Sequence, residues 1–370
     1  MTRALGIAVV LLLLVATTAL AQESGTVDEF ERVFVRWMKE HHVARGGLAV
    51  GQGDRLVLAK GYGGLTADRR TLIASLSKAI TSVCVATLVQ EGKVRLDTPL
   101  GELLGRRYGP PRDARLRTVT VEQLLTHRAG FGRSHGDPVT GATLGEVLGR
   151  RAVSQATMHD LVPGVLRTTL EHDPGTTFVY TNAAHLLLGV GIEAVTGRRY
   201  EDYCAAAVLR PQGVRDATLD ARWGVLGSFG GWSLTGAEYL AFLRTFAPTA
   251  SLLNADTRAW MLSRDGKEAA TAPQFYSLLF VLPDGGQGHH FFHSGSWGYR
   301  LSATSRSGAI NDSIGTRAMR TASGISWYVV YEPRPDVAAR NVLDRELARA
   351  AAAVKTWPDT DLFPALGVRP

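Results

Sequence analysis

The hydrophobic positions in the first hundred residues follow two different periods. Residues 27–42 place apolar side chains at helical spacing, which predicts a helix. Alternating runs at 48–50 and 56–60 flank the tripeptide Gln-Gly-Asp at 52–54, a pattern typical of a β-hairpin. A strongly apolar run over about 75–91, ended by a glycine, predicts a second and buried helix.

The rest of the chain changes from a helical pattern back to strands. Residues 96–265 are helical and loop-rich, with frequent proline and glycine. Strand patterns then occur at 275–282, 289–293, 300–304 and 325–332, followed by a helical run over about 336–354. We therefore expect an α/β lobe of about 27–95 and 266–358, whose sheet is completed after an all-helical lobe of about 96–265.

Composition and charge narrow the class of protein. The chain has 370 residues, of which 45% are hydrophobic and 20% charged, so it is large enough for one big domain or two fused lobes. The formal charge is +7, but the basic residues are scattered rather than gathered in a stripe with aromatic residues. This distribution predicts a solvated basic surface and no nucleic-acid partner.

The first 21 residues have the features of a secretory signal peptide. Arg3 provides a positive start, residues 8–16 are unbroken apolar, and Ala-Leu-Ala at 19–21 is a small-x-small cleavage site. The alternative is a membrane anchor, but the apolar run is short compared with the roughly 20 residues that span a bilayer. We expect the mature chain, 22–370, to be exported to the periplasm or the medium without a stable membrane anchor.

Cys84 and Cys204 are the only cysteines and permit one disulfide. Cys84 lies in an apolar helical pattern with Val83, Val85 and Leu88, where a small buried thiol is common. The pattern therefore predicts two free buried thiols rather than a bridge, although the expected compartment is oxidising.

Ser75 and Lys78 form an S-x-x-K motif, which occurs once in the chain. A serine hydroxyl needs a neighbour that takes its proton before it can attack a carbonyl, and the i to i+3 spacing puts the lysine amine on the same helix face. Partial burial would lower the pKa of Lys78, as a base at neutral pH requires. At the start of a helix, Ser75 would lie at the positive end of the helix dipole, where an amide of the first turn would face outward toward a developing oxyanion.

The setting of this motif, TLIASLSKAITS over 71–82, is a loop that runs into a buried helix. It resembles the serine β-lactamase and penicillin-binding-protein superfamily, in particular its class C β-lactamase, DD-peptidase and esterase branch. The resemblance covers nearly the whole mature chain. It implies an α+β fold with an antiparallel sheet flanked by helices, an all-helical lobe, and the active site in the cleft between them.

Tyr180 and Asn182, in the segment PGTTFVYTN over 174–182, resemble the family's Y-x-N element. A phenol is a poor base unless a cation favours its phenolate, and Lys78 is the candidate cation. The resemblance implies that Tyr180 passes the proton from Ser75 to the leaving group and later activates the deacylating water. It also implies that Asn182 hydrogen-bonds Lys78 and the substrate. Taken alone, Tyr180 would be a buried tyrosine with a satisfied hydroxyl.

His293, Ser294 and Gly295 resemble the family's K-T-G strand with histidine in place of lysine. The resemblance implies that Gly295 lets the substrate backbone lie close to the strand, and that the amides of Ser296 and Ser75 are the oxyanion donors. A neutral imidazole binds a drug carboxylate less well than the permanent cation of lysine, which favours peptidases and esterases over β-lactamases. If His293 lines the cleft, we expect activity toward anionic peptides to have a His293-dependent component near pH 6 to 7, close to the imidazole pKa of about 6.5.

Two further segments also resemble the family, and two other patterns suggest a metal site or a cofactor site that we do not predict. LLTHRAG over 124–130 and GGWSLT over 230–235 resemble family segments, the second near the site mouth, and His127 is expected to be a structural hydrogen-bonder. His289 and His293 would share a strand face, but the carboxylates nearby do not fall at ligand spacing, so no metal is predicted. Gly189-Val190-Gly191 lacks the third glycine of a dinucleotide fingerprint, and no cofactor is predicted.

Together these residues predict a secreted serine hydrolase that acts through a Ser75 acyl-enzyme on a small-molecule or peptide substrate. An ester or amide is the first choice, including D-amino-acid peptides. Two alternatives stay open: a class C-like β-lactamase, and a non-catalytic protein that binds penicillin or peptidoglycan. The intact set of Ser75, Lys78 and Tyr180 favours an enzyme.

Overall fold

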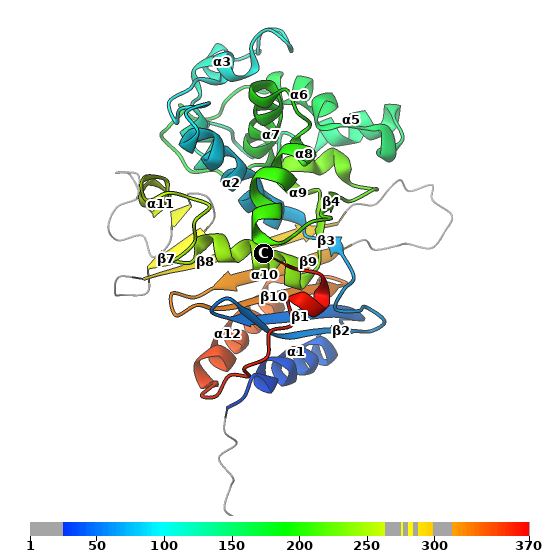
Figure 1. Cartoon of the computed structure of the whole chain (residues 1–370). Helices are drawn as coiled ribbons and strands as arrows, with labels where there is room; N and C mark the ends of the chain where they lie inside the picture. The colour runs from blue at the N-terminus through cyan, green and yellow to red at the C-terminus, as the bar shows by residue number, and fades with distance from the viewer. Residues whose placement is uncertain (1–24, 263–274, 277–279, 284–287, 299–312, 370) are drawn as a thin grey trace, which may run out of the picture.

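The computed structural model describes residues 25–262, 275–276, 280–283, 288–298 and 313–369 (Figure 1). The expected signal peptide and the strand predicted at 300–304 lie outside these ranges.

The main sheet brings the two ends of the chain together. Within the described residues it has seven strands in the order β2-β1-β10-β9-β8-β7-β6, and its neighbouring strands are antiparallel. The strands are β1 (Arg45–Gln52), β2 (Arg55–Tyr62), β6 (Phe275–Tyr276), β7 (Phe280–Pro283), β8 (His289–Trp297), β9 (Ile314–Arg320) and β10 (Ile325–Glu332). The predicted hairpin is confirmed, with Gly53 at a φ of 63° in its turn.

Strand β9 was not predicted, and its sequence explains why. It reads IGTRAMR, in which a glycine, a threonine and two arginines interrupt the apolar alternation. Thr316 and Arg320 are nevertheless buried, because β8 and β10 pair with β9 on both sides. Its position is therefore decided by its neighbours rather than by its own pattern.

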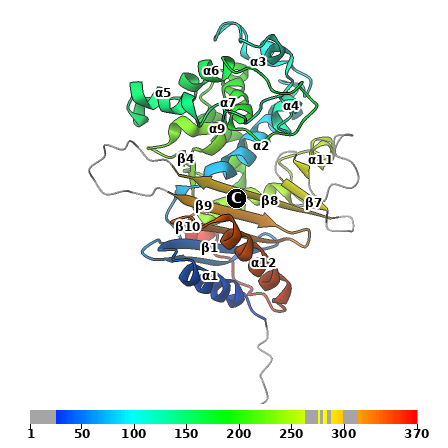
Figure 2. The ribbon, with the colours of Figure 1, turned by 180° about the vertical axis from the view of Figure 1, so that it is seen from behind.

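Helices cover both faces of the sheet (Figures 1 and 2). On the outer face, α1 (Asp28–Glu40) packs against α12 (Val337–Ala353). The buried side chains Phe30, Val33, Phe34 and Trp37 of α1 recur at helical spacing and form one core with strand residues such as Val329. On the other face, α10 (Gly236–Leu243) contacts β1 and β10.

Helix α2 (Ser77–Gln90) lies between the sheet and the helical lobe, and its residues from Ser77 to Leu88 are buried. Burial on all sides explains the continuous apolar pattern of this segment. The lobe beyond it contains α3 (Leu100–Leu104), α4 (Val121–Leu125), α5 (Ala142–Arg150), α6 (Met158–Leu166), α7 (Asn182–Thr196), α8 (Tyr200–Cys204) and α9 (Gly227–Gly230). Helix α11 (Ala255–Leu262) lies beside β7 at the edge of the main sheet (Figures 1 and 2). The described helices include none with both the length and the apolarity needed to cross a membrane.

A small sheet stands where the sequence pattern predicted helices and loops. Strands β3 (Thr71–Leu72), β5 (Trp232–Leu234) and β4 (Thr218–Leu219) pair in that order. Strand β3 ends at Leu72, shortly before Ser75, so the small sheet ties the start of α2 to the segment around Trp232. Strands of two or three residues carry too little periodicity to be recognised from sequence.

The prediction of two free thiols is wrong, because Cys84 of α2 and Cys204 of α8 form a disulfide. Both residues are fully buried, and their Cα atoms lie 5.6 Å apart, within the usual range for a bridge. The packing of α2 against α8 brings them together across 120 residues of sequence. The apolar context of Cys84 showed its burial but not which element it faces.

Candidate active site

Ser75 lies in a tight turn between the small sheet and α2. Residues Ala74–Leu76 form one turn of 3-10 helix, and Ala74 has a φ of +51°, an uncommon conformation for a residue with a side chain. Two hydrogen bonds hold Ile73, the residue before this turn. Ile73 N donates to Trp232 O at 2.9 Å, and Thr316 Oγ1 donates to Ile73 O at 2.8 Å. Ser75 is therefore presented by a turn anchored to both sheets.

Lys78 is fully buried, one helical turn after Ser75. Its Nζ lies 3.2 Å from Ser75 Oγ and donates to Asn182 Oδ1 at 2.7 Å and to the Phe229 carbonyl at 2.8 Å. Burial lowers the pKa of Lys78 to about 7, although the Asp137 carboxylate acts in the opposite direction. A neutral amine has two N–H donors, which Asn182 and Phe229 can accept, so its lone pair is left for the Ser75 proton.

Tyr180 stands beside this pair, with its ring centroid 5.0 Å from Lys78 Nζ. Burial raises the pKa of the phenol above its ordinary value, and a hydrogen bond with Ser75 offsets this only in part. The pKa of the phenol thus moves in the opposite direction to the expected Lys78-stabilised phenolate, and a pKa of about 7 leaves Lys78 only partly charged at neutral pH. At neutral pH Tyr180 is a phenol, which can accept one proton while it donates another.

Asp137 fixes the position of Asn182 and was not recognised from the sequence. Its Oδ2 accepts a hydrogen bond from the backbone N–H of Asn182 at 2.8 Å. Its Oδ1 accepts from the backbone N–H groups of Val139 at 3.0 Å and Thr140 at 3.2 Å. The Asn182 side chain also donates to Thr140 Oγ1 at 3.4 Å, so its Oδ1 is directed toward Lys78. Asp137 lies in a loop before α5, where no local pattern distinguishes it from a surface aspartate.

Gly295 on β8 makes room for the Ser75 turn. A Cβ atom at this position would lie 2.3 Å from Thr316 Oγ1, 2.5 Å from Ile73 O and 3.0 Å from Ser75 N. The space beside its Cα is therefore occupied by the turn that holds Ser75, which gives this glycine a structural reason. The expected close approach of the substrate backbone stays a prediction.

Substituting Gly295→Ala should lower kcat for a short-chain ester by about a hundredfold or more, because misplacing a reacting group by about 1 Å has an effect of that size. Gly145→Ala on α5 is the matched control, since a Cβ there meets nothing within 4 Å. Kinetics and thermal melting of both variants would check this. Full activity in a folded Gly295→Ala variant would contradict the assigned role.

His293 is buried on β8, with its ring centroid 6.4 Å from that of Tyr180. Its Nδ1 lies 2.9 Å from the Ser294 carbonyl, the geometry of an N–H donor in the neutral ring. Burial and the nearby Lys78 lower the pKa of His293 to about 3. The predicted His293 component of activity near pH 6 to 7 is therefore wrong, because the imidazole stays neutral through that range.

A cavity of about 250 Å³ opens at Ser75. It is lined by Ala74, Ser75, Thr140, Asn182, Phe229, Gly230, Ser296, Trp297, Gly298 and Arg334. Ser296 thus meets Ser75 at one cavity, and Gly230, the first residue of the segment 230–235, lines the same cavity. Ser294 is not part of the lining. Arg334 follows β10 and is brought in by the tertiary structure alone.

The structure agrees with a family comparison. The family model described as Beta-lactamase matches residues 30–308. The chain belongs to this family. Protein flp of Staphylococcus aureus is 24% identical over 194 residues, which are 50% of this chain and 36% of the relative, so the match spans about a third of that protein's length.

Solved structures show the same fold. The octameric penicillin-binding protein homologue from Pyrococcus abyssi has a TM-score of 0.67 and 21% identity, over 90% of this chain and 79% of the other. The D-stereospecific amidohydrolase from a Streptomyces species has a TM-score of 0.68 and 19% identity, over 87% and 98%. The predicted α+β fold of the β-lactamase and DD-peptidase type is thereby confirmed.

Other residues that could suggest a functional site, near the family site or outside it, make structural contacts instead. His127 is buried, and its Nδ1 accepts the Thr181 amide at 3.3 Å, as expected of a structural hydrogen-bonder. Ser134 lies in a G-x-S-x-G pattern at 132–136, but it is exposed in a loop and donates to Glu171 at 2.6 Å, without the strand-turn-helix of a nucleophile elbow. In the described ranges, His, Cys, Asp and Glu side chains do not gather as a metal site requires.

The pKa of Lys78 predicts the pH profile. With the neutral amine acting as the base, as the S-x-x-K motif predicts, kcat/KM for a neutral ester should rise with pH through about 7 and then level off. The variant His293→Gln should keep this limb in place, since His293 titrates near 3. Stopped assays between about pH 5 and 9 test this. A flat profile, or a limb that disappears in His293→Gln, would reject Lys78 as the titrating group.

Proposed function

We propose that the protein is an exported serine hydrolase that forms an acyl-enzyme on Ser75. The observation that carries this proposal is the contact of 3.2 Å between Ser75 Oγ and the buried Nζ of Lys78, whose pKa of about 7 leaves a large neutral fraction at physiological pH. A serine beside an ammonium of ordinary pKa would have no base. Here the base and the nucleophile are already in hydrogen-bond contact.

The reaction follows from the positions of these groups. Lys78 takes the Ser75 proton as Oγ attacks the substrate carbonyl, and the amides of Ser75 and Ser296 stabilise the negative oxygen. Tyr180 passes the proton on to the leaving alcohol or amine, since its phenol accepts one proton as it donates another. Water then attacks the acyl carbonyl by the reverse relay, which releases the acid and restores the Ser75 hydroxyl.

We propose esters and amides, including D-amino-acid peptides, as the first substrate class and β-lactams as the second. His293 supports this order, because a neutral imidazole replaces a lysine cation on the strand beside the site. Arg334 lines the Ser75 cavity and can bind a substrate carboxylate through its fork of N–H donors. The similarity to a D-stereospecific amidohydrolase points in the same direction.

A panel of p-nitrophenyl esters, D-amino-acid peptides and nitrocefin tests this order through kcat/KM. Esters or D-peptides should exceed nitrocefin. A nitrocefin value above about 10⁵ M⁻¹s⁻¹, in the range of evolved substrates, would reverse the order. Labelling of Ser75 by a fluorescent penicillin without turnover of any compound would favour the non-catalytic binding protein instead.

Export is the second part of the proposal and is supported by the signal-like pattern over 1–21. Cell fractionation and N-terminal sequencing test it. A mature protein that begins at Gln22 outside the cytoplasm is expected, and a cytoplasmic chain that retains Arg3 would contradict it.

A further inference from the structure

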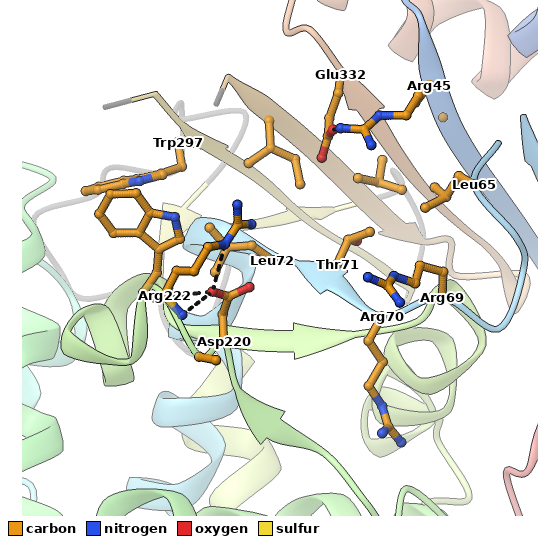
Figure 3. Close-up of a pocket in the computed structure, with 15 residues that line it drawn as sticks. Arg45, Leu65, Arg69, Arg70, Thr71, Leu72, Asp220, Arg222, Trp297 and Glu332 are labelled. Atoms are coloured by element: carbon orange, nitrogen blue, oxygen red, sulfur yellow. Dashed lines mark hydrogen bonds and ion pairs between the residues drawn. The ribbon is translucent and has the colours of Figure 1, made fainter. Parts of the chain in front are cut away.

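A second cavity, of about 370 Å³, lies next to the Ser75 cavity and shares Trp297 with it (Figure 3). It is formed by the ends of β8 and β10, the start of β9, strand β3 with the loop before it, and the segment 220–223. Its volume is within the range of sites that bind small molecules. We call it the Arg69 groove, after the residue that decides its charge.

Two tryptophans form an apolar wall at the end of the groove near Ser75, beside Arg222 and Asp220 (Figure 3). Trp223 and Trp297 meet edge to face, with ring centroids 5.2 Å apart and an angle of 66° between their planes. Ile314 pairs with Trp297 across β8 and β9, and Leu72 of β3 also lines the groove. Aromatic and aliphatic walls of this kind favour an apolar ligand segment.

Most of the charges along the groove are paired. Arg45 forms an ion pair with Glu332, and Arg222 lies 3.7 Å from Asp220. Arg70 extends away from the groove, where its Nε donates to Glu238 Oε2 at 3.0 Å (Figure 3).

Arg69 differs from these arginines. It is exposed, it stands at the end of the groove far from Trp297 (Figure 3), and within the part of the chain that the structure describes its side chain has no ion pair. Among the residues that line the groove, one end therefore has the positive charge of Arg69, and the other has an apolar wall beside the Arg222–Asp220 pair (Figure 3).

We propose that the Arg69 groove binds an extended substrate through an apolar segment along Trp223 and Trp297 and a terminal carboxylate at Arg69. A guanidinium matches a carboxylate with parallel N–H donors, which makes it selective for such a group. The inference rests on the proposed function, because Ser75 chemistry is the reason for a substrate to occupy the adjoining cavity. It adds the substrate class: acyl or peptidyl compounds with an anionic end remote from the scissile bond.

Matched D-alanine p-nitroanilides with a glutaryl or a neutral valeryl cap test the acyl side. Matched depsipeptides with a free or an amidated terminal carboxylate test the leaving-group side. The measured quantity is the ratio of kcat/KM for the anionic member to that for the neutral member, at low and high salt. At one of the two positions the wild-type ratio should be about tenfold, and it should fall with salt because the arginine is exposed.

The variant Arg69→Gln should reduce that ratio at least fivefold, and Arg69→Lys should retain part of it. Arg106→Gln, an exposed arginine in the helical lobe, is the control for net charge and should leave the ratio unchanged. A ratio near one at both positions, or an equal ratio in Arg69→Gln and wild type, would overturn the proposal.

Calorimetry of the same pairs with Ser75→Ala separates the two proposals, because that variant binds without turnover. Preference for the anionic member, lost in Ser75→Ala/Arg69→Gln, would support the groove even if no compound in the panel were hydrolysed. Equal affinity for both members, in a protein that does hydrolyse the neutral ester, would reject the groove and leave the proposed function standing.

Discussion

Replacing Ser75 by alanine is expected to lower kcat for a short-chain ester by at least about a thousandfold. The substitution removes the only atom that can form the acyl bond in the proposed reaction and leaves the turn in place, because the contacts that hold the turn are made by the Ile73 backbone with Trp232 and Thr316. The contact to Lys78 Nζ at 3.2 Å would be lost, but Lys78 would keep its acceptors on Asn182 and Phe229. Ester kinetics together with a melting curve would measure the effect.

Ser134→Ala is the matched control for this prediction. Its hydroxyl is exposed and bonded to Glu171, so its loss should leave ester turnover within about twofold of wild type, as is usual for surface substitutions. A fluorophosphonate should label the tryptic peptide that contains Ser75 and not the one that contains Ser134. Near wild-type turnover in Ser75→Ala would end the acyl-enzyme proposal.

Replacing Lys78 by methionine should have nearly the same effect on kcat, since it fills similar volume without a basic nitrogen. Ser75 and Lys78 act as a unit, so the double variant should be little slower than either single one. Methionine leaves the Asn182 and Phe229 acceptors without their donor, and each lost buried hydrogen bond can cost about 1–3 kcal/mol of stability. The melting temperature should therefore fall together with activity.

A second substitution separates the chemical role of Lys78 from its structural one. Lys78→Arg keeps a cation and N–H donors for the two acceptors, but a guanidinium stays protonated and cannot act as a base. We expect it to restore part of the stability without restoring turnover. Substantial ester hydrolysis in Lys78→Arg would show that a charge at this position is sufficient and that proton abstraction by Lys78 is not required.

The features that the sequence by itself determined are those carried by neighbours along the chain. Helical spacing in 28–40 decides which face of α1 is buried, and the spacing from Ser75 to Lys78 puts hydroxyl and amine on one side of a helical turn. Both follow from the geometry of a helix, whatever surrounds it. The motifs around Ser75, Tyr180 and His293 likewise indicated the fold, because each is a short run in which several positions together must hold particular residue types.

The tertiary structure decided the properties that depend on distant residues. The hydrogen-bond acceptors of Lys78 are Asn182 Oδ1 and the Phe229 carbonyl, which lie more than a hundred residues away in sequence. Thr316, which holds the Ser75 turn, belongs to a strand without a clear pattern of its own. The disulfide between Cys84 and Cys204 depends on the contact between α2 and α8, so no local pattern could distinguish it from two buried thiols.

The protonation states of Lys78, Tyr180 and His293 show most directly what the sequence determined and what the tertiary structure decided. The residue types of Lys78, Tyr180 and His293 predicted that all three titrate in one site. Their states depend on burial, which moves the pKa of Lys78 to about 7 and that of His293 to about 3 while it raises that of Tyr180. The free energy of removing a charge from water depends on every group packed around it, and those groups come from both lobes. The motifs therefore indicated that Ser75, Lys78, Tyr180 and His293 share one site. The fold added Phe229, Asp137 and Arg334 to it and decided which groups carry a proton.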